Sequence, residues 1–167
     1  SVRVQVFFQN NSTVASNMLE YTSYRLKDCK NLVDLYGGVG VFGIANAHRF
    51  HSTIIESVPA AIREAKNNAK RNNVEPRIIQ KDARQLGRIE LDQPFVMITD
   101  PPRSGMHPHT LAAIRRLQPE QIIYISCNPD QQKKEIRRLD YRIRQVGLFD
   151  MFPQTPHIES VVELVPV

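Results

Sequence analysis

The amino-acid sequence predicts an α/β protein built on a mostly parallel β-sheet with helices on both faces. Short apolar segments alternate with longer segments of helical periodicity along most of the chain. Several of the short segments are apolar at nearly every position, as expected of parallel strands that are buried on both sides. A glycine-rich segment follows the first predicted strand, where open α/β sheets often bind a ligand.

The size and composition of the chain favour one globular domain. It has 167 residues, of which 41% are hydrophobic and 23% charged. No apolar run approaches the roughly 20 residues needed to span a membrane, and the first residues lack the pattern of a signal peptide. The formal net charge of +5 is compatible with a polyanionic partner, although charge alone indicates nothing about the fold.

The two cysteines, Cys29 and Cys127, do not form a C-x-x-C pair and are too few for a disulfide scaffold. We therefore expect a cytoplasmic protein. Since the chain runs from Ser1 directly into the apolar segment 2–8, we also expect residues 1–167 to be one domain of a longer protein.

Periodicity and turn residues place each element. The expected helices cover residues 12–27, 42–50, 58–72, 108–117 and 130–139. The expected strands cover residues 31–35, 53–56, 77–80, 94–100, 121–126, 141–149 and 158–165. The last two strands have no obvious helix between them, which predicts an antiparallel hairpin at the end of the sheet.

Glycines and carboxylates fall where predicted strands end. The segment 34–40, Asp-Leu-Tyr-Gly-Gly-Val-Gly, lets the backbone approach a ligand closely. Glu56 ends the second strand, where its carboxylate can accept hydrogen bonds from ribose hydroxyls, and Asp82 follows the third, where an adenine amino group can be read. The glycine segment lacks the Gly-Lys-Ser/Thr ending of a phosphate-binding loop, but a nicotinamide dinucleotide would also fit this pattern.

Two proline-containing segments follow the next strands. Asp100-Pro101-Pro102-Arg103 comes after the most apolar strand, and its prolines favour a rigid, extended backbone. Cys127 follows the strand after that. A lone cysteine at the end of an apolar strand is usually a small buried side chain, so its position alone does not indicate catalysis.

Taken together, these segments resemble the catalytic domain of the RNA uracil-5 methyltransferases, which make 5-methyluridine in transfer and ribosomal RNA. The matching segments occur in the family's order and are spread over essentially the whole chain. They are Phe8-Gln9-Asn10, residues 34–40, Asp100-Pro101-Pro102-Arg103, Ser126-Cys127-Asn128-Pro129, and residues 150–155 with His157-Ile158-Glu159.

The resemblance implies a class I S-adenosylmethionine-dependent methyltransferase, with a Rossmann-like, mostly parallel seven-stranded sheet and an antiparallel C-terminal strand. It implies that Gln9, Tyr36, Glu56 and Asp100 surround S-adenosylmethionine and that Asp82 lies near its adenine. Two positions depart from the family. Gly37 stands where relatives often have a cysteine, and Val41 where they often have a polar residue.

The resemblance also makes Cys127 the nucleophile and Glu159 the general base. The chemistry supports both residue types, since C5 of uracil is too weak a nucleophile to take a methyl group unaided. A thiolate that adds to C6 turns the ring into an enolate whose C5 can attack the methyl group. A carboxylate must then remove the C5 proton so that the thiolate can leave. Arg103 could stabilise the enolate oxygen or hold a phosphate.

Two alternatives remain open at this point. Asp-Pro-Pro partly resembles the motif of amino methyltransferases that act without a covalent adduct, although Arg103 replaces their aromatic residue. The chain could also be a cofactor-binding or RNA-binding module that is inactive by itself. His107 and His109 lack a third ligand at suitable spacing, so no metal is expected.

The RNA that is modified is not fixed by the sequence. Met151 and Gln154 make the C-terminal motif more typical of the ribosomal-RNA type, but transfer RNA stays possible. The basic run from Lys133 to Arg138 is most simply the solvated face of a helix, with an RNA-facing patch as the alternative.

Overall fold

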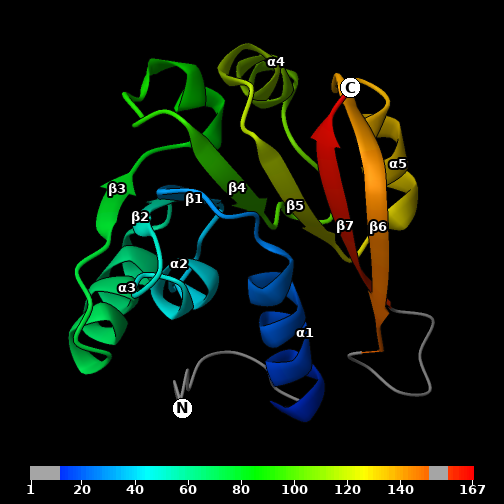
Figure 1. The fold of residues 1–167 in the computed structure, drawn as a ribbon. Helices are drawn as coiled ribbons and strands as arrows, with labels where there is room; N and C mark the ends of the chain where they lie inside the picture. The colour runs from blue at the N-terminus through cyan, green and yellow to red at the C-terminus, as the bar shows by residue number, and fades with distance from the viewer. Residues whose placement is uncertain (1–11, 151–157) are drawn as a thin grey trace.

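A computed structural model describes residues 12–150 and 158–167 of the chain, which form a seven-stranded sheet in the order β3-β2-β1-β4-β5-β7-β6 (Figure 1). The first five strands pair in parallel, and β7 is antiparallel to both of its neighbours. The strands are β1 Asn31–Leu35, β2 His51–Glu56, β3 Arg77–Gln80, β4 Phe95–Thr99, β5 Gln121–Ser126, β6 Tyr141–Phe149 and β7 Glu159–Pro166. This topology confirms the predicted fold class.

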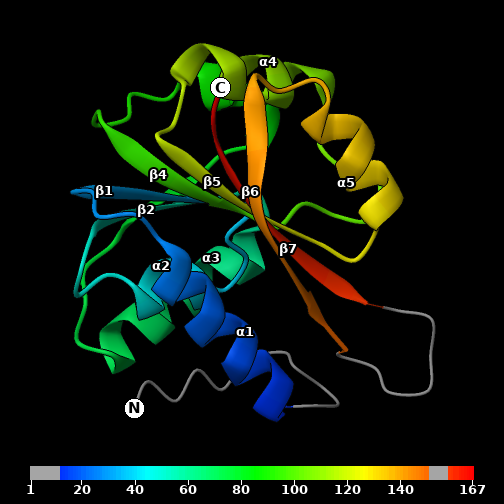
Figure 2. The same cartoon turned by 45° about the vertical axis from the view of Figure 1, so that its right-hand side comes forward.

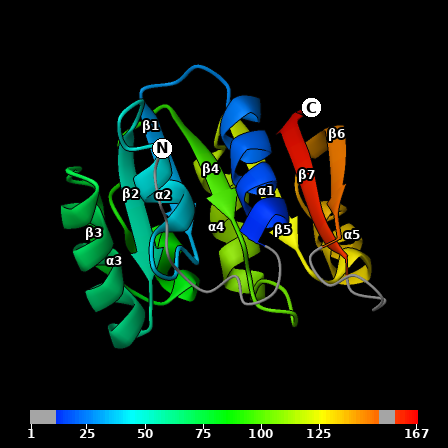
Figure 3. The same ribbon diagram turned by 90° about the horizontal axis from the view of Figure 1, so that it is seen from below.

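Helices cover both faces of the sheet (Figures 2 and 3). The helices are α1 Ser12–Arg25, α2 Val41–Ala45, α3 Pro59–Arg71, α4 Pro108–Leu117 and α5 Pro129–Ile136, with a 3-10 helix at Ala83–Arg88. Helices α1, α2 and α3 pack on one face, and the 3-10 helix, α4 and α5 on the other. Since β1, β4 and β5 are buried at every position, their mostly apolar character follows from this two-sided covering.

The predicted elements are found with small differences at their ends. Helix α2 stops at Ala45 because Asn46 caps it and donates its side-chain amide to the carbonyl of Phe42 at 2.9 Å. Helix α5 ends at Ile136, three residues earlier than expected. The 3-10 helix at Ala83–Arg88 was not predicted, and Asp82 caps its first turn.

Strand register gathers the ends of five strands at one edge of the sheet. Leu35 pairs with Ile55 on one side and with Thr99 on the other. Ser126, the last residue of β5, pairs with Ser160 near the start of the antiparallel strand β7. The residues that follow β1, β4 and β5 therefore lie at the same edge as Glu159, the first residue of β7. Among the described helices, none is long and apolar enough to cross a membrane.

Candidate functional site

The turn after β1 requires glycine. Gly38 and Gly40 have φ values of 53° and 86°, which L side chains adopt at a cost. A Cβ at Gly40 would lie 2.6 Å from Cδ1 of Ile44, whereas a Cβ at Gly38 would have no atom within 4 Å. Gly40 therefore serves close packing, and Gly38 faces open space where a ligand can approach the backbone.

The carboxylate of Glu56 links the end of β2 to this turn. It accepts a hydrogen bond from the backbone N–H of Gly38 at 3.0 Å, and from those of Ser57 and Val58 at 2.6 and 2.7 Å. The side chain is only partly exposed. The hydroxyl of Ser57 also donates to Oε1 at 3.3 Å, so three donors share Oε1, whereas Oε2 accepts from Gly38 and keeps a second acceptor position for a donor at the site.

Asp34 supports the same turn from inside the protein. It is 1% exposed, and its Oδ2 accepts a hydrogen bond from the N–H of Gly43 in α2 at 2.8 Å. Burial raises the pKa of its carboxyl to about 7, and the nearby charge of Glu56 adds to the effect. Asp34 thus fastens α2 to β1.

Tyr36, which follows β1, is half-buried with a φ of 60°. A positive φ is uncommon for a residue with a bulky side chain, and such strain is often found near functional sites. The ring packs against the apolar core under α4, and burial raises the pKa of its hydroxyl. The charges of Glu135 and Asp82 raise it further, so both carboxylates lie near the Tyr36 hydroxyl.

Asp82 is held by Arg84, two residues later. Its Oδ1 accepts hydrogen bonds from the backbone N–H and Nε of Arg84 at 2.8 and 2.9 Å, and its Oδ2 accepts one from Nη2 at 2.7 Å. These contacts lower the pKa of the Asp82 carboxyl to about 2. Three of its acceptor positions are in use, so one is left for another donor.

Asp100, Cys127 and Glu159 act on one another electrostatically. Burial is the largest cause that raises the pKa of the Cys127 thiol, and the charges of Glu159 and Asp100 add to it. Burial also raises the pKa of Glu159. The Asp100 side chain keeps an exposed face, yet the protein around it and the charge of Glu159 raise its pKa to about 7. The structure therefore brings the two predicted catalytic residues and Asp100 together.

Arg103 lies close enough to Cys127 for its positive charge to lower the pKa of the thiol. Its carbonyl accepts a hydrogen bond from Nδ2 of Asn128 at 3.1 Å, which ties its loop to the residue after Cys127. Asn128 also caps α5 by accepting from the N–H of Gln131 at 3.2 Å.

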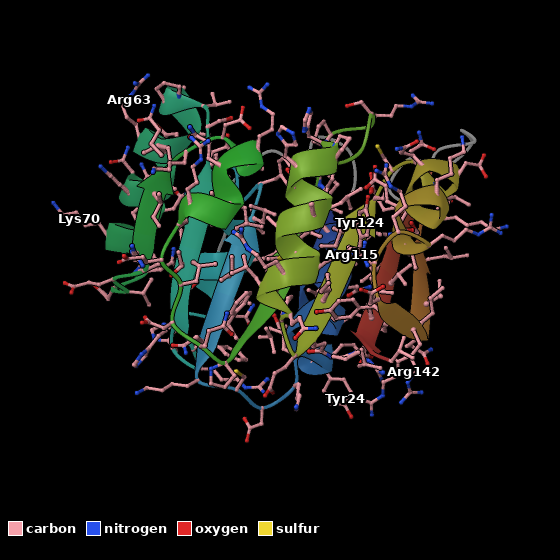
Figure 4. The ribbon with its side chains drawn as sticks, turned by 90° about the horizontal axis from the view of Figure 1, so that it is seen from above. Tyr24, Arg63, Lys70, Arg115, Tyr124 and Arg142 are labelled. Carbon is pink, nitrogen blue, oxygen red and sulfur yellow. The ribbon has the colours of Figure 1, made fainter. Side chains whose placement is uncertain are left out.

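A buried carboxylate binds the loop between β4 and α4 near its α4 end. Glu135 of α5 is 1% exposed and accepts hydrogen bonds from the N–H of Met106 at 2.9 Å, Nε2 of Gln131 at 2.7 Å and the hydroxyl of Tyr124 at 2.5 Å. Figure 4 shows Tyr124 on the side of the sheet that α4 covers. Gly105, with a φ of 83°, lies against Glu135, where a Cβ would overlap Oε1.

No sequence pattern predicts the contacts of Glu135. Glu135 and the neighbouring Gln132 belong to a segment, Pro129–Ile136, that is polar at most positions, so both residues look solvent-facing. Their burial depends on partners that only the fold brings near, and no local pattern marks them. Asp34 was recognised as part of a motif but not as a buried carboxyl.

Some of the residues named from the sequence fall in the parts of the chain that the structure does not describe. Gln9 lies outside the described residues, as do Met151 and Gln154. His107 caps α4, with its Nδ1 accepting from the N–H of His109 at 3.1 Å. Over residues 12–150 and 158–167, no group of three or more His, Cys, Asp or Glu side chains is placed to hold a metal.

Basic side chains are spread over the surface. Lys133 and Lys134 are exposed on α5, and Arg137 and Arg138 are exposed in the turn that follows it. Figure 4 shows Arg63 and Lys70 of α3 at one end of the molecule and Arg142 of β6 at the other. Within residues 12–150 and 158–167, this dispersed arrangement marks no single nucleic-acid surface.

Comparison with known proteins places the chain in a family. The model of the tRNA (uracil-5-)-methyltransferase family matches residues 2–166. The tRNA (uracil(54)-C(5))-methyltransferase of Pyrococcus abyssi is 39% identical over 160 residues, which cover 95% of this chain and 38% of that protein. An uncharacterised RNA methyltransferase of Chlamydia trachomatis is 34% identical over 171 residues, covering 98% of this chain and 43% of the relative. The chain thus spans about two fifths of the relatives' length.

Solved structures of methyltransferases have the same fold as this chain. The crystal structure of the Pyrococcus abyssi enzyme in complex with S-adenosyl-L-homocysteine superposes with a TM-score of 0.86 and 37% sequence identity, covering 96% of this chain and 40% of that one. TrmN from Thermus thermophilus superposes with a TM-score of 0.68 at 16% identity, covering 91% of this chain and 48% of the other. The second likeness shows the fold alone.

Proposed function

Because the chain belongs to the tRNA (uracil-5-)-methyltransferase family, we propose that it transfers a methyl group from S-adenosylmethionine to C5 of a uridine in transfer RNA. The observation that carries the proposal is the gathering of Cys127, Asp100 and Glu159 at one edge of the sheet. The names of the Pyrococcus relatives favour transfer RNA over ribosomal RNA. The chain spans 38% of the length of the first of these relatives. The proposal therefore assigns to residues 1–167, taken as one domain, the catalytic step alone.

The residues at the carboxyl ends of β1, β2 and β3 fit the cofactor. Gly38 offers backbone beside open space, and Glu56 keeps an acceptor position for a ribose hydroxyl. Asp82 keeps one for the adenine amino group after Arg84 has taken three. Tyr36, Asp100 and Gln9 complete the proposed binding set. S-adenosylmethionine, when bound, supplies a methyl group on a positively charged sulfur.

In the proposed reaction, the thiolate of Cys127 adds to C6 of the uracil. The electron pair of the C5=C6 bond moves toward the O4 carbonyl, so that C5 of the resulting enolate can attack the methyl carbon. The bond from that carbon to the sulfonium sulfur would break, with its electron pair left on sulfur. Arg103 supplies positive charge on this side of the site, which favours the thiolate. The target uridine has to leave its stack, because a paired base would keep C5 and C6 out of reach.

Glu159 completes the reaction by removing the C5 proton. The electrons of the C–H bond re-form the C5=C6 double bond, and the thiolate of Cys127 leaves C6. Burial raises the pKa of Glu159, which makes the carboxylate a stronger base than an exposed one. The charge of Glu159 raises the pKa of Asp100, so the two carboxylates repel each other, and uptake of the proton by Glu159 relieves that repulsion.

The test is a methylation assay with mapped products. Purified protein is incubated with methyl-labelled S-adenosylmethionine and with transfer RNA or ribosomal RNA that lacks 5-methyluridine, and the digested RNA is analysed by mass spectrometry. We expect label in 5-methyluridine from transfer RNA. Cys127→Ala should abolish it, whereas Cys29→Ala, a change at the other cysteine, should not.

Other products would reject parts of the proposal. Label on a nitrogen would show a methyltransferase that works without the C6 adduct. Label in ribosomal RNA alone would overturn the choice of transfer RNA. Cofactor binding in a calorimetric titration without transfer to either RNA would indicate a binding module instead of an enzyme.

A further inference from the structure

The buried face of α5 holds a glutamine that connects the two strands bearing the proposed catalytic residues. Gln132 is 3% exposed. Its Nε2 donates to the carbonyl of Tyr124 in β5 at 2.8 Å, and its Oε1 accepts from the hydroxyl of Ser160 in β7 at 2.7 Å. Both ends of the side-chain amide are therefore used, one on each strand.

The contact with Ser160 lies where β5 and β7 separate. Ser160 pairs with Ser126, and its Oγ also lies 3.0 Å from the carbonyl of Ser126. Cys127 is the next residue after Ser126, and Glu159 is the residue before Ser160. This pair ends the β5–β7 ladder, so it opens more easily than the pairs inside that ladder. On its other side, the start of β7 stays paired with the edge strand β6, where Glu159 pairs with Phe149.

The turn that carries Cys127 has contacts of its own. The N–H of Asn128 donates to Oγ of Ser126 at 3.0 Å, and Nδ2 of Asn128 donates to the carbonyl of Arg103 at 3.1 Å. These bonds do not involve Gln132. Loss of the Gln132 side-chain amide should therefore loosen the start of β7 more than the turn at Cys127.

We propose that Gln132, acting through Ser160, is a positioning residue that holds Glu159 where it can remove the C5 proton. This inference rests on the proposed function. It assigns Gln132 to the elimination step and not to the addition of Cys127 to the ring. Proton transfer needs the base within hydrogen-bonding distance of the proton, and a displacement of about 1 Å can cost on the order of 100-fold in rate.

The test compares addition with elimination in Gln132→Met, which keeps the length of the side chain and removes both hydrogen bonds. Addition is measured by covalent capture of RNA that contains 5-fluorouridine, because fluorine at C5 blocks the elimination. Capture should proceed within about twofold of the unaltered protein. Turnover on uridine RNA should slow by about 10- to 100-fold, and a denaturation-resistant protein–RNA adduct should accumulate.

Companion variants separate positioning from general damage. Ser160→Ala should reproduce the accumulation, Ser160→Thr should retain turnover because it keeps a hydroxyl, and Gln145→Met, at an exposed site on β6, should change nothing. If Gln132 acts through Glu159, combining Gln132→Met with Glu159→Gln should slow elimination no further than Glu159→Gln alone.

The inference is overturned if capture and turnover fall together, or if Gln132→Met and Ser160→Ala turn over normally. Should Gln132→Met fail to fold, Ser160→Ala decides the matter by the same two measurements. Absence of any 5-fluorouridine capture by the unaltered protein would instead remove the proposed covalent mechanism itself. The two failures are therefore distinguishable.

Discussion

Gly105→Ala should destabilise the protein because of the contact between Gly105 and Glu135. The alanine must adopt a φ of 83°, at a cost of about 1–2 kcal/mol. Its Cβ would also overlap Oε1 of Glu135, which accepts the N–H of the buried Met106. Displacing that oxygen leaves a buried donor without a partner, at about 1–3 kcal/mol. The expected loss in the free energy of unfolding is therefore about 2–5 kcal/mol.

Urea denaturation, followed by circular dichroism, measures this loss. Gly38→Ala is the matched control, because Gly38 has a φ of 53° but no atom within 4 Å of the position of a Cβ. It should lose only the backbone cost of about 1–2 kcal/mol. The reasoning is refuted if Gly105→Ala costs no more than Gly38→Ala.

A double variant tests the cause of the loss. Glu135→Ala leaves the N–H of Met106 and the hydroxyl of Tyr124 unpartnered, which should cost about 2–6 kcal/mol for the two buried donors. Combined with Gly105→Ala, the loss should fall short of the sum by about 1–3 kcal/mol, since the overlap disappears and the bond to Met106 is already broken. Additive losses would show that the two residues do not act on each other.

Three further predictions concern single side chains. The folded state holds a proton on Asp34 between its ordinary pKa of 3.8 and its raised pKa of about 7, so this group makes stability fall as pH rises through that window. Asp34→Asn should remove this pH dependence. In urea titrations, the free energy of unfolding of the variant relative to that of the unaltered protein should grow by at most about 4 kcal/mol between pH 4 and 8. A difference that stays constant with pH would contradict the burial argument. Glu56→Gln should weaken S-adenosylmethionine binding by about 10- to 100-fold in calorimetry, since hydrogen bonds to charged groups are worth about 1.5–3 kcal/mol, and unchanged affinity would exclude Glu56 from the site. Glu159→Gln should lower the pKa of Cys127 and speed its alkylation by iodoacetamide at fixed pH in a Cys29→Ser background, and an unchanged rate would show that the two groups do not interact.

Much of the fold could be predicted from the sequence, because the composition of the central strands identifies them. β4 and β5 are apolar at almost every position, and prolines or glycines mark the segments around them. The expected strand at residues 121–126 and the expected helix at residues 108–117 match the structure at both ends. These elements are set by periodicity and local turn chemistry, which a sequence displays directly.

The candidate site was predictable for a different reason. Tyr36, Glu56, Asp100 and Cys127 stand at or just after strand ends, and parallel strands bring their carboxyl ends to one edge of the sheet. The position of Glu159 depended on the family resemblance, since a carboxylate at the start of a strand is ordinary by itself.

The supporting contacts could not be predicted. Glu135 meets Met106, which is 29 positions away, and Gln132 meets Ser160, which is 28 positions away. Such contacts arise from packing of α5 against the sheet, and nothing in a polar helical segment distinguishes a buried glutamate from an exposed one. Arg84 is the exception, because its spacing of two residues from Asp82 is typical of a local cap.

Covalent capture by Cys127 tests the central claim most directly. The protein is incubated with S-adenosylmethionine and with transfer RNA that contains 5-fluorouridine, and adducts are resolved under denaturing conditions and mapped by mass spectrometry. We predict an adduct at Cys127 in the unaltered protein and in Cys29→Ala, and none in Cys127→Ala. An adduct that persists in Cys127→Ala, or methylation of uridine C5 by that variant, would contradict the account.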